Sequence, residues 1–124
     1  MSSIEYLRIY SDPEGISHFE TKSLELELKD FAPPAPPLKT STVESANSSV
    51  FLELPVSWYG DWHPTPARQW MILMSGELEF EAGDGERSIQ KAGDIVLLDD
   101  TTGKGHQTKV LGNESVRIAA IQFP

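Results

Sequence analysis

Apolar and polar residues alternate along much of the chain, in short runs that end at turns. The run Ser23–Leu28 alternates leucine with serine or glutamate, and Ile4–Tyr10 and the longer segment Ser17–Leu28 carry similar alternation. A period of two is typical of a strand with one buried face, and neither segment has the period of a helix. The N-terminal part is therefore predicted to form two strands.

Further short runs after Ser49 predict more strands: Val50–Leu54, Gln69–Met74, Glu77–Glu81, Glu86–Gln90, Asp94–Leu98, His106–Leu111 and Ser115–Phe123. Most are separated by turns that contain glycine, which adopts the backbone conformations tight turns need. Many short strands with almost no helical pattern predict an all-β sandwich or barrel. A length of 124 residues fits one domain.

Four prolines interrupt the pattern within Phe31–Pro37. Proline lacks an amide donor and holds the backbone extended, so this segment is predicted to be a loop outside the regular strands. Two roles remain open for it, a stiff spacer or a lip over a pocket.

The charge and the residue composition limit the class of partner. Nineteen acidic and ten basic side chains give a net charge of -9, which disfavours nucleic acid and anionic membrane surfaces as partners. There are no cysteines, so disulfides and thiolate metal sites are excluded. The first residues lack a basic and apolar leader pattern, and no apolar run approaches the roughly 20 residues that cross a bilayer. We expect a soluble, cytoplasmic protein.

Residues suited to a site gather in two segments, Gly60–Gln69 and Thr101–His106. Folding of a small β-barrel would bring His63, Gln69 and His106 toward one pocket. Alternation along the strand that starts at Gln69 places Met71 on the same inner face. An apolar wall with a few polar groups is typical of a small-molecule site.

The spacing of these residues resembles the cupin superfamily, whose first motif reads G-x5-H-x-H-x3,4-E-x6-G. In this sequence His63 takes the first histidine position, and Gly76 closes the motif. Thr65 stands where the second histidine is expected and Gln69 where the glutamate is expected, so half of the metal signature is replaced.

The second cupin motif reads G-x5-P-x-G-x2-H-x3-N and is also matched in part. Gly93 opens it, Gly103 and His106 keep the G-x2-H spacing, Thr101 takes the proline position after a lengthening of two residues, and Val110 replaces the asparagine. The resemblance covers Gly60 to about Leu111. It implies a single antiparallel jelly-roll β-barrel domain over residues 1–124, with an N-terminal strand extension over about residues 1–48, and it leaves the chemistry open.

Two kinds of chemistry fit His63, Gln69 and His106. As ligands they could hold a divalent Fe, Ni, Mn or Zn ion, although glutamine brings no charge and affinity would be weakened. Without a metal, the two histidines could act as general acid and base, with Gln69 holding a carbonyl or enolate. We therefore expect a non-redox lyase, dehydratase or isomerase, including cyclisation. A metal-dependent oxygenase and a binding or sensor module without turnover remain the alternatives.

Further residues are predicted to bind the substrate: Trp62 and Tyr59 by stacking, Arg68 and Lys104 by charge, and Thr65 and Met71 from the pocket wall. Trp70, on the face opposite Gln69, is expected to pack against other residues. His18, Asp99 and Asp100 are expected to have structural roles only, and the two aspartates are expected to form a turn. The exposed edges of the N-terminal strands favour a homodimer.

Overall fold

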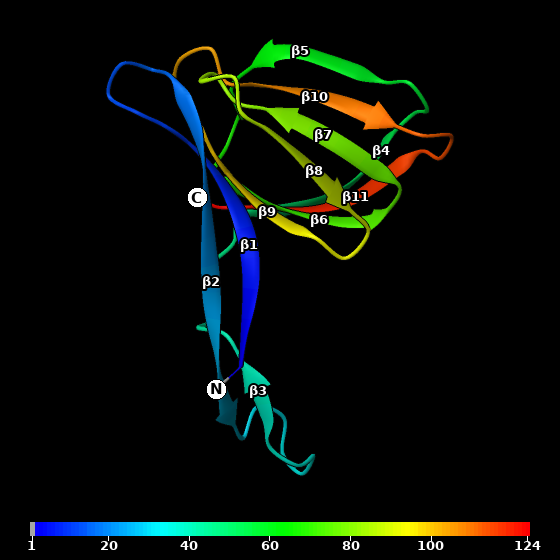
Figure 1. Cartoon of the computed structure of the whole chain (residues 1–124). Helices are drawn as coiled ribbons and strands as arrows, with labels where there is room; N and C mark the ends of the chain where they lie inside the picture. The colour runs from blue at the N-terminus through cyan, green and yellow to red at the C-terminus, as the bar shows by residue number, and fades with distance from the viewer. Residues whose placement is uncertain (1) are drawn as a thin grey trace.

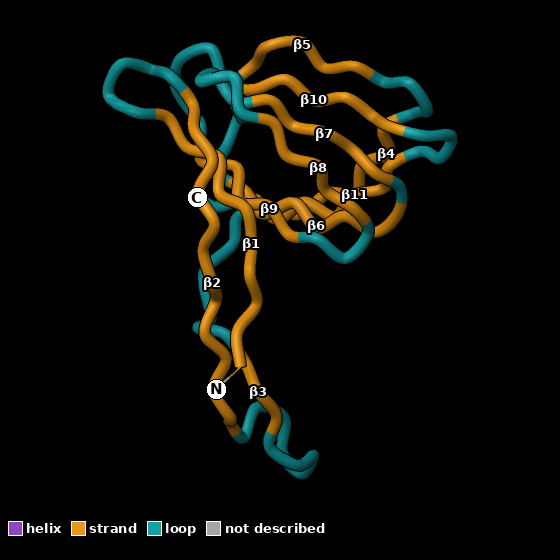
Figure 2. Tube along the Cα trace, viewed as in Figure 1, coloured by secondary structure: helices purple, strands orange, loops and turns teal. Residues whose placement is uncertain are grey.

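The computed structural model describes residues 2–124, which form eleven strands and no helix (Figures 1 and 2). No part of this range could cross a bilayer as a helix. The strands are β1 (Ser2–Ser11), β2 (Ser17–Lys29), β3 (Leu38–Thr40), β4 (Ser48–Leu54), β5 (Tyr59–His63), β6 (Gln69–Ser75), β7 (Glu77–Glu81), β8 (Arg87–Lys91), β9 (Ile95–Asp99), β10 (His106–Leu111) and β11 (Val116–Gln122).

The strands form two sheets (Figure 1). The larger has seven strands in the order β3-β2-β1-β9-β6-β11-β4, and the smaller has four in the order β5-β10-β7-β8. All neighbours are antiparallel except β1 and β9, which pair in parallel and depart from the purely antiparallel arrangement expected. Strand β4 is an edge of the larger sheet, and β5, the next strand in the chain, is an edge of the smaller one. These two edges therefore flank the space between the sheets.

Two strands lie where the sequence pattern predicted none. Tyr59–His63 forms β5, and Leu38–Thr40 forms the short strand β3. Each pairs with only one neighbour, β5 with β10 and β3 with β2. An edge strand needs neither a continuous apolar run nor a strict alternation, so its pattern is weak in the sequence.

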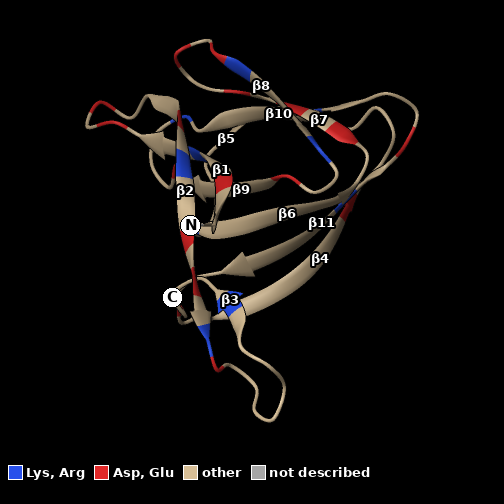
Figure 3. Ribbon diagram, turned by 60° about the horizontal axis from the view of Figure 1, so that its bottom comes forward, with Lys and Arg blue, Asp and Glu red and all other residues tan. Residues whose placement is uncertain are grey.

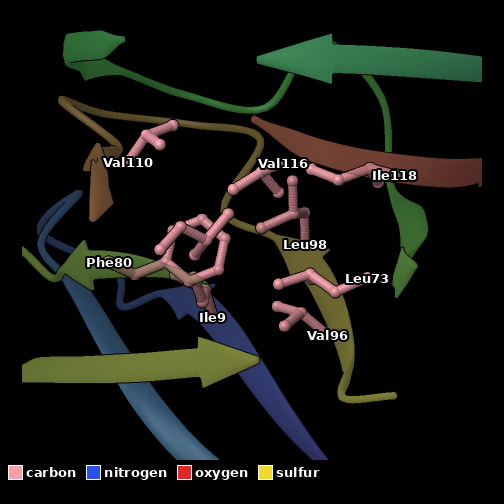
Figure 4. Packing of buried hydrophobic residues seen from close by; sticks show 9 residues of the cluster. Ile9, Leu73, Phe80, Val96, Leu98, Val110, Val116 and Ile118 are labelled. Atoms are coloured by element: carbon pink, nitrogen blue, oxygen red, sulfur yellow. The ribbon is translucent and has the colours of Figure 1, made fainter. Parts of the chain in front are cut away.

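A hydrophobic core lies between the sheets. Its buried members include Ile9, Leu73, Phe80, Val96 and Ile118, which come from five different strands (Figure 4). Since most of these side chains belong to strands distant in the sequence, the core fixes the positions of the two sheets relative to each other. The side chains that surround the candidate site are continuous with this core.

We call the two packed sheets the body. An extension of the larger sheet projects from the body and contains no buried residue (Figures 1 and 2). We call it the arm and define it as residues 2–5 and 23–40. It consists of the outer ends of β1 and β2 together with β3. The proline segment Phe31–Pro37 lies at its free end, outside regular strands as predicted, and lines no part of the cavity described below. The position fits a spacer and contradicts a lip over the pocket.

Candidate functional site

A cavity of about 320 Å³ lies between the two sheets. Its wall is predominantly apolar, with a small number of polar side chains. The lining residues come from both sheets and the loops between them: Val50, Leu52, Leu54, Trp58, His63, Thr65, Pro66, Gln69, Met71, Leu78, Phe80, Leu98, His106, Thr108, Ile118 and Gln122. His63, Gln69 and His106 thus share one cavity, together with Thr65 and Met71.

The two histidines face each other across a pair of strands. His63 ends β5, His106 begins β10, and the two residues are direct partners in the antiparallel ladder. Their ring centroids lie 4.8 Å apart at an interplanar angle of 54°. Gly105 has a φ of +80° and packs so closely on the His63 carbonyl that any side chain there would collide with it. The turn before His106 therefore requires glycine, which brings the rings together.

Each imidazole is held through its Nδ1 atom. His63 Nδ1 lies 2.6 Å from the backbone carbonyl oxygen of Asp61, and His106 Nδ1 lies 2.6 Å from Asp100 Oδ2. When Nδ1 carries the proton, the neutral ring has its lone pair on Nε2. Both Nε2 atoms are then the nitrogens left to act on a ligand.

Asp100 is a site residue that the sequence analysis assigned to a turn. Its side chain is fully buried, and its Oδ1 atom has no hydrogen-bond partner among the described residues. Its Oδ2 atom accepts from His106, whose ring is buried and also meets Phe80 edge-on at 5.5 Å. A buried carboxylate at this position fixes the orientation of the His106 ring.

A chain of hydrogen bonds fixes Gln69. Its Nε2 donates to Thr65 Oγ1 at 3.0 Å, and Thr65 in turn donates to the Ala67 carbonyl at 2.7 Å. Gln122 Nε2 approaches Gln69 Oε1 at 3.4 Å, and Ser48 donates to Gln122 at 2.7 Å. Thr65 and Gln69 are both buried, so this network holds the amide in one orientation at the cavity wall.

Tyr59, Trp62, Arg68 and Lys104, predicted to contact the substrate, do not line the cavity. Tyr59 is exposed on the outer side of β5, where desolvation, followed by the neighbouring Asp61 charge, raises the pKa of its phenol. Lys104 lies 4.5 Å from the centre of the Trp62 ring. Arg68 lies over Phe123 at 4.6 Å and approaches Asp99 at 3.5 Å.

Several lining residues were not among the predicted site residues, and Thr108 and Trp58 are two of them. Thr108 follows His106 by two positions, so strand alternation alone places it on the same face. Trp58, and not Tyr59 or Trp62, is the aromatic residue of the Trp58–Trp62 segment that lines the cavity, and its ring occupies the space that a side chain at Gly60 would need. Trp70 packs as expected, edge-on to Tyr6 at 4.8 Å.

The donor set does not fit a resident metal ion. Among the described residues, no group of three or more histidine, cysteine, aspartate or glutamate side chains is placed to hold one. Catalytic metal sites in proteins commonly use three protein ligands, whereas this cavity offers two imidazoles. The Gln69 amide, expected as the third ligand, is already engaged with Thr65 and Gln122. We therefore derive no chemistry through a metal.

Comparisons with solved structures identify the fold. The cupin domain of Cnp3 from Schizosaccharomyces pombe matches with a TM-score of 0.51 and 14% identity, over 100% of this chain and 86% of that one. A cupin-2 domain protein from Shewanella frigidimarina matches with a TM-score of 0.46 and 18% identity, over 61% of this chain and 69% of that one. A putative ethanolamine utilization protein from Salmonella typhimurium matches with a TM-score of 0.40 and 20% identity, over 100% of this chain and 98% of that one.

No protein-family model and no curated protein matches the sequence. The likeness to the Cnp3 domain spans the whole chain, and at this identity it shows the fold alone. The chain therefore has a small cupin fold, as the motif spacing predicted. Its chemistry has to be argued from the cavity itself.

Proposed function

We propose that the chain is a non-redox enzyme, a lyase, dehydratase or isomerase, that moves protons on a small molecule bound between its two sheets. The jelly-roll barrel implied by the motifs is the architecture we propose for it. The observation that carries the proposal is the pair of imidazoles at 4.8 Å, each fixed through Nδ1 and each lining one apolar cavity. Two positioned rings of this kind can remove a proton at one atom and deliver one at another.

The surroundings of the two rings favour different roles. His106 is buried, and the Asp100 carboxylate holds its Nδ1, which orients the ring for proton transfer. His63 is partly exposed and bonded to a neutral carbonyl. We assign His106 as the general base and His63 as the general acid, which donates from Nε2 when both of its ring nitrogens carry a proton. The second hydrogen of the Gln69 amide is available to a carbonyl or enolate oxygen.

Proton exchange beside a carbonyl tests this proposal without knowledge of the natural substrate. Simple ketones are incubated with the protein in D2O, and deuterium uptake at the carbon next to the carbonyl is followed by NMR. His106→Gln and His63→Gln are each expected to lower the rate by about 10²- to 10⁴-fold, the usual contribution of a positioned acid or base. His18→Gln removes a histidine outside the cavity and is the matched control.

The pH profile separates the roles of Asp100 and Gln69. Asp100→Asn removes the negative charge beside His106, so the limb of the profile set by the base should move to lower pH and the rate should fall. Gln69→Glu adds a charge near both rings and should move the limb to higher pH. A role of Asp100 in folding alone would leave the profile in place.

Two outcomes would contradict the proposal. Ketone binding without any exchange above background would favour the non-catalytic binding module. Near-stoichiometric metal in the purified protein, lost in both histidine variants and bound more tightly by Gln69→Glu, would favour the metal-dependent enzyme.

A further inference from the structure

We infer that the cavity selects small, uncharged, largely apolar molecules that carry a carbonyl or hydroxyl group at one end. This inference deepens the proposed function, because it defines which substrates can reach the two histidines. It rests on the charge, the polarity gradient and the size of the cavity.

The first argument is charge. None of the described residues that line the cavity is a lysine, arginine, aspartate or glutamate. Arg68 and Lys104, the two basic residues that the sequence predicted to bind the substrate, are engaged with Phe123 and Trp62 instead. Phosphate and carboxylate groups are usually bound by such side chains. A bound anion would also lie near the Asp100 carboxylate behind His106, and this repulsion disfavours it.

Figure 3 shows where the charged residues lie along the strands. They concentrate on the arm, on β7 and β8 and in the loops, whereas β6 carries none and β4 and β11 carry few. Of the strands that form the wall of the larger sheet, β4, β6, β9 and β11, only β11 carries a cation, Arg117, and its guanidinium is paired with Glu53 at 2.9 Å.

The second argument is polarity, which changes along the cavity. Gln69 and Gln122 are direct partners in the β6–β11 ladder, and they mark the end at which Thr65 and the two histidines lie. Further along the same strands, Ile118 pairs with Leu52 of β4. The far end is built from aliphatic and aromatic side chains: Leu52, Leu54, Trp58, Leu78 and Ile118. A ligand with one polar end and an apolar body matches this gradient.

The polar end also limits the chemistry of the polar group. Each imidazole retains Nε2, and the Thr108 hydroxyl, two residues from His106, can both donate and accept. Gln69 and Thr65 are largely engaged with each other and with Gln122. A single carbonyl or hydroxyl oxygen can be bound by these groups, whereas a sugar with many hydroxyls would lose more hydrogen bonds to water than the wall replaces.

The third argument is size. A cavity of about 320 Å³ lies at the lower end of the range for small-molecule sites. If each non-hydrogen atom takes about the 30 Å³ of a water molecule in the liquid, the cavity holds roughly ten such atoms. This corresponds to a short-chain or monocyclic compound and is too small for a nucleotide sugar.

Binding of matched probes tests the inference independently of turnover. We choose 2-octanone as the neutral probe, octanoate as its charged analogue and shorter methyl ketones as the size series, titrated at pH 8 and followed by NMR. 2-Octanone is expected to bind at least about tenfold more tightly than octanoate. Each methylene removed from the ketone should weaken binding by about fourfold, which corresponds to burial of that group in an apolar wall.

A pair of variants locates the binding. Leu52 lines the cavity and is 36% exposed, so Leu52→Lys introduces a cation without filling the core. This substitution should weaken the binding of 2-octanone and strengthen the binding of octanoate, so that the order of their affinities reverses. Phe51→Lys is the matched control, because the neighbouring Phe51 is 76% exposed and lies outside the cavity lining. It should leave the preference unchanged, and thermal melting checks that both variants fold.

The inference is overturned if octanoate binds the wild-type protein as tightly as 2-octanone, if 2-octanone does not bind at millimolar concentration, or if the two lysine variants behave alike. Failure of the proposed function has a different signature. In that case 2-octanone binds with the expected preference, but no deuterium exchange above background is observed.

Discussion

The body and the arm of this protein are built from the same kind of alternating strand, yet they differ in what covers their apolar faces. In the body, Leu73 and Ile118 are fully enclosed between two sheets. In the arm, Leu24, Leu26 and Leu28 alternate equally regularly, but Leu28 is 66% exposed and none of the three is buried. Alternation predicts that a strand has an apolar face, and only the tertiary arrangement decides whether the same chain covers it.

The largest expected contrast is in stability. Leu73→Ala leaves a cavity in a closed core and should lower the free energy of unfolding by about 2 to 5 kcal/mol. Leu28→Ala, at the exposed end of the arm, should change it by no more than about 0.5 kcal/mol when the protein is dilute enough to be a monomer. Chemical denaturation measures both values. Equal losses would mean that the arm has a core of its own.

The second contrast concerns association. We propose that the apolar face of the arm, formed by Leu24, Leu26, Leu28 and Ile4 opposite Leu24, is covered by a second copy of the chain in a homodimer. Light scattering of the wild-type protein at micromolar concentration should then give the mass of a dimer.

The two faces of β2 provide matched variants for this test. The double substitution of Leu26 and Leu28 by glutamine should yield a monomer. The same substitution of Glu25 and Glu27, which alternate with these leucines, should leave the dimer intact. A wild-type monomer, or two double variants with the same mass, would refute the arm as the dimer contact.

The smallest expected effect lies where the hairpin of β1 and β2 is tied to the body. His18 Nε2 lies 2.7 Å from Asp12 and its Nδ1 lies 3.0 Å from Asp84 in the turn between β7 and β8. The hydrogen bond with Asp12 raises the pKa of His18 against some desolvation, and the same bond lowers the pKa of Asp12.

These shifts define a pH window. The charged ring stabilises the fold fully below the unfolded histidine pKa of about 6.5, and this contribution is lost as the pH rises through the raised pKa of the folded state. The Asp12 contribution is present above about pH 4 and is lost on acidification through its lowered pKa. His18→Gln should therefore lower the melting temperature by a small amount near pH 5.5 and by less at pH 9. A difference that grows with pH would contradict the ion pair.

More of the fold than of the site could be predicted from the sequence. Strand β6 and the histidines could be predicted because alternation and motif spacing are local properties of the chain. The edge strand β5 could not, since its pairing with β10 depends on residues more than forty positions away. Arg68 was expected at the substrate because of its neighbours in sequence, but its guanidinium lies over Phe123, which is brought beside it only by the pairing of β11.

The same reasoning explains which site residues were missed. Thr108 was available from strand alternation after His106, and it was overlooked. Asp100 was not available in this way, because an aspartate before a Thr-Thr-Gly turn is read first as a turn residue. Its burial against His106 depends on the path of the loop between β9 and β10, which brings the two side chains together, and no local pattern encodes that path.

The unpartnered Oδ1 of Asp100 has a consequence for engineering this protein. Asp100 and His106 form a buried pair with one carboxylate oxygen unsatisfied, and replacement of both partners of such a pair by apolar residues of similar volume is often neutral or stabilising. A selection for thermal stability would thus favour variants in which Asp100 and His106 are replaced together. Such variants would be more stable and would have lost the proposed activity. Thermal tolerance and proton transfer are opposed at this pair of residues, so a screen of this protein has to select for both at once.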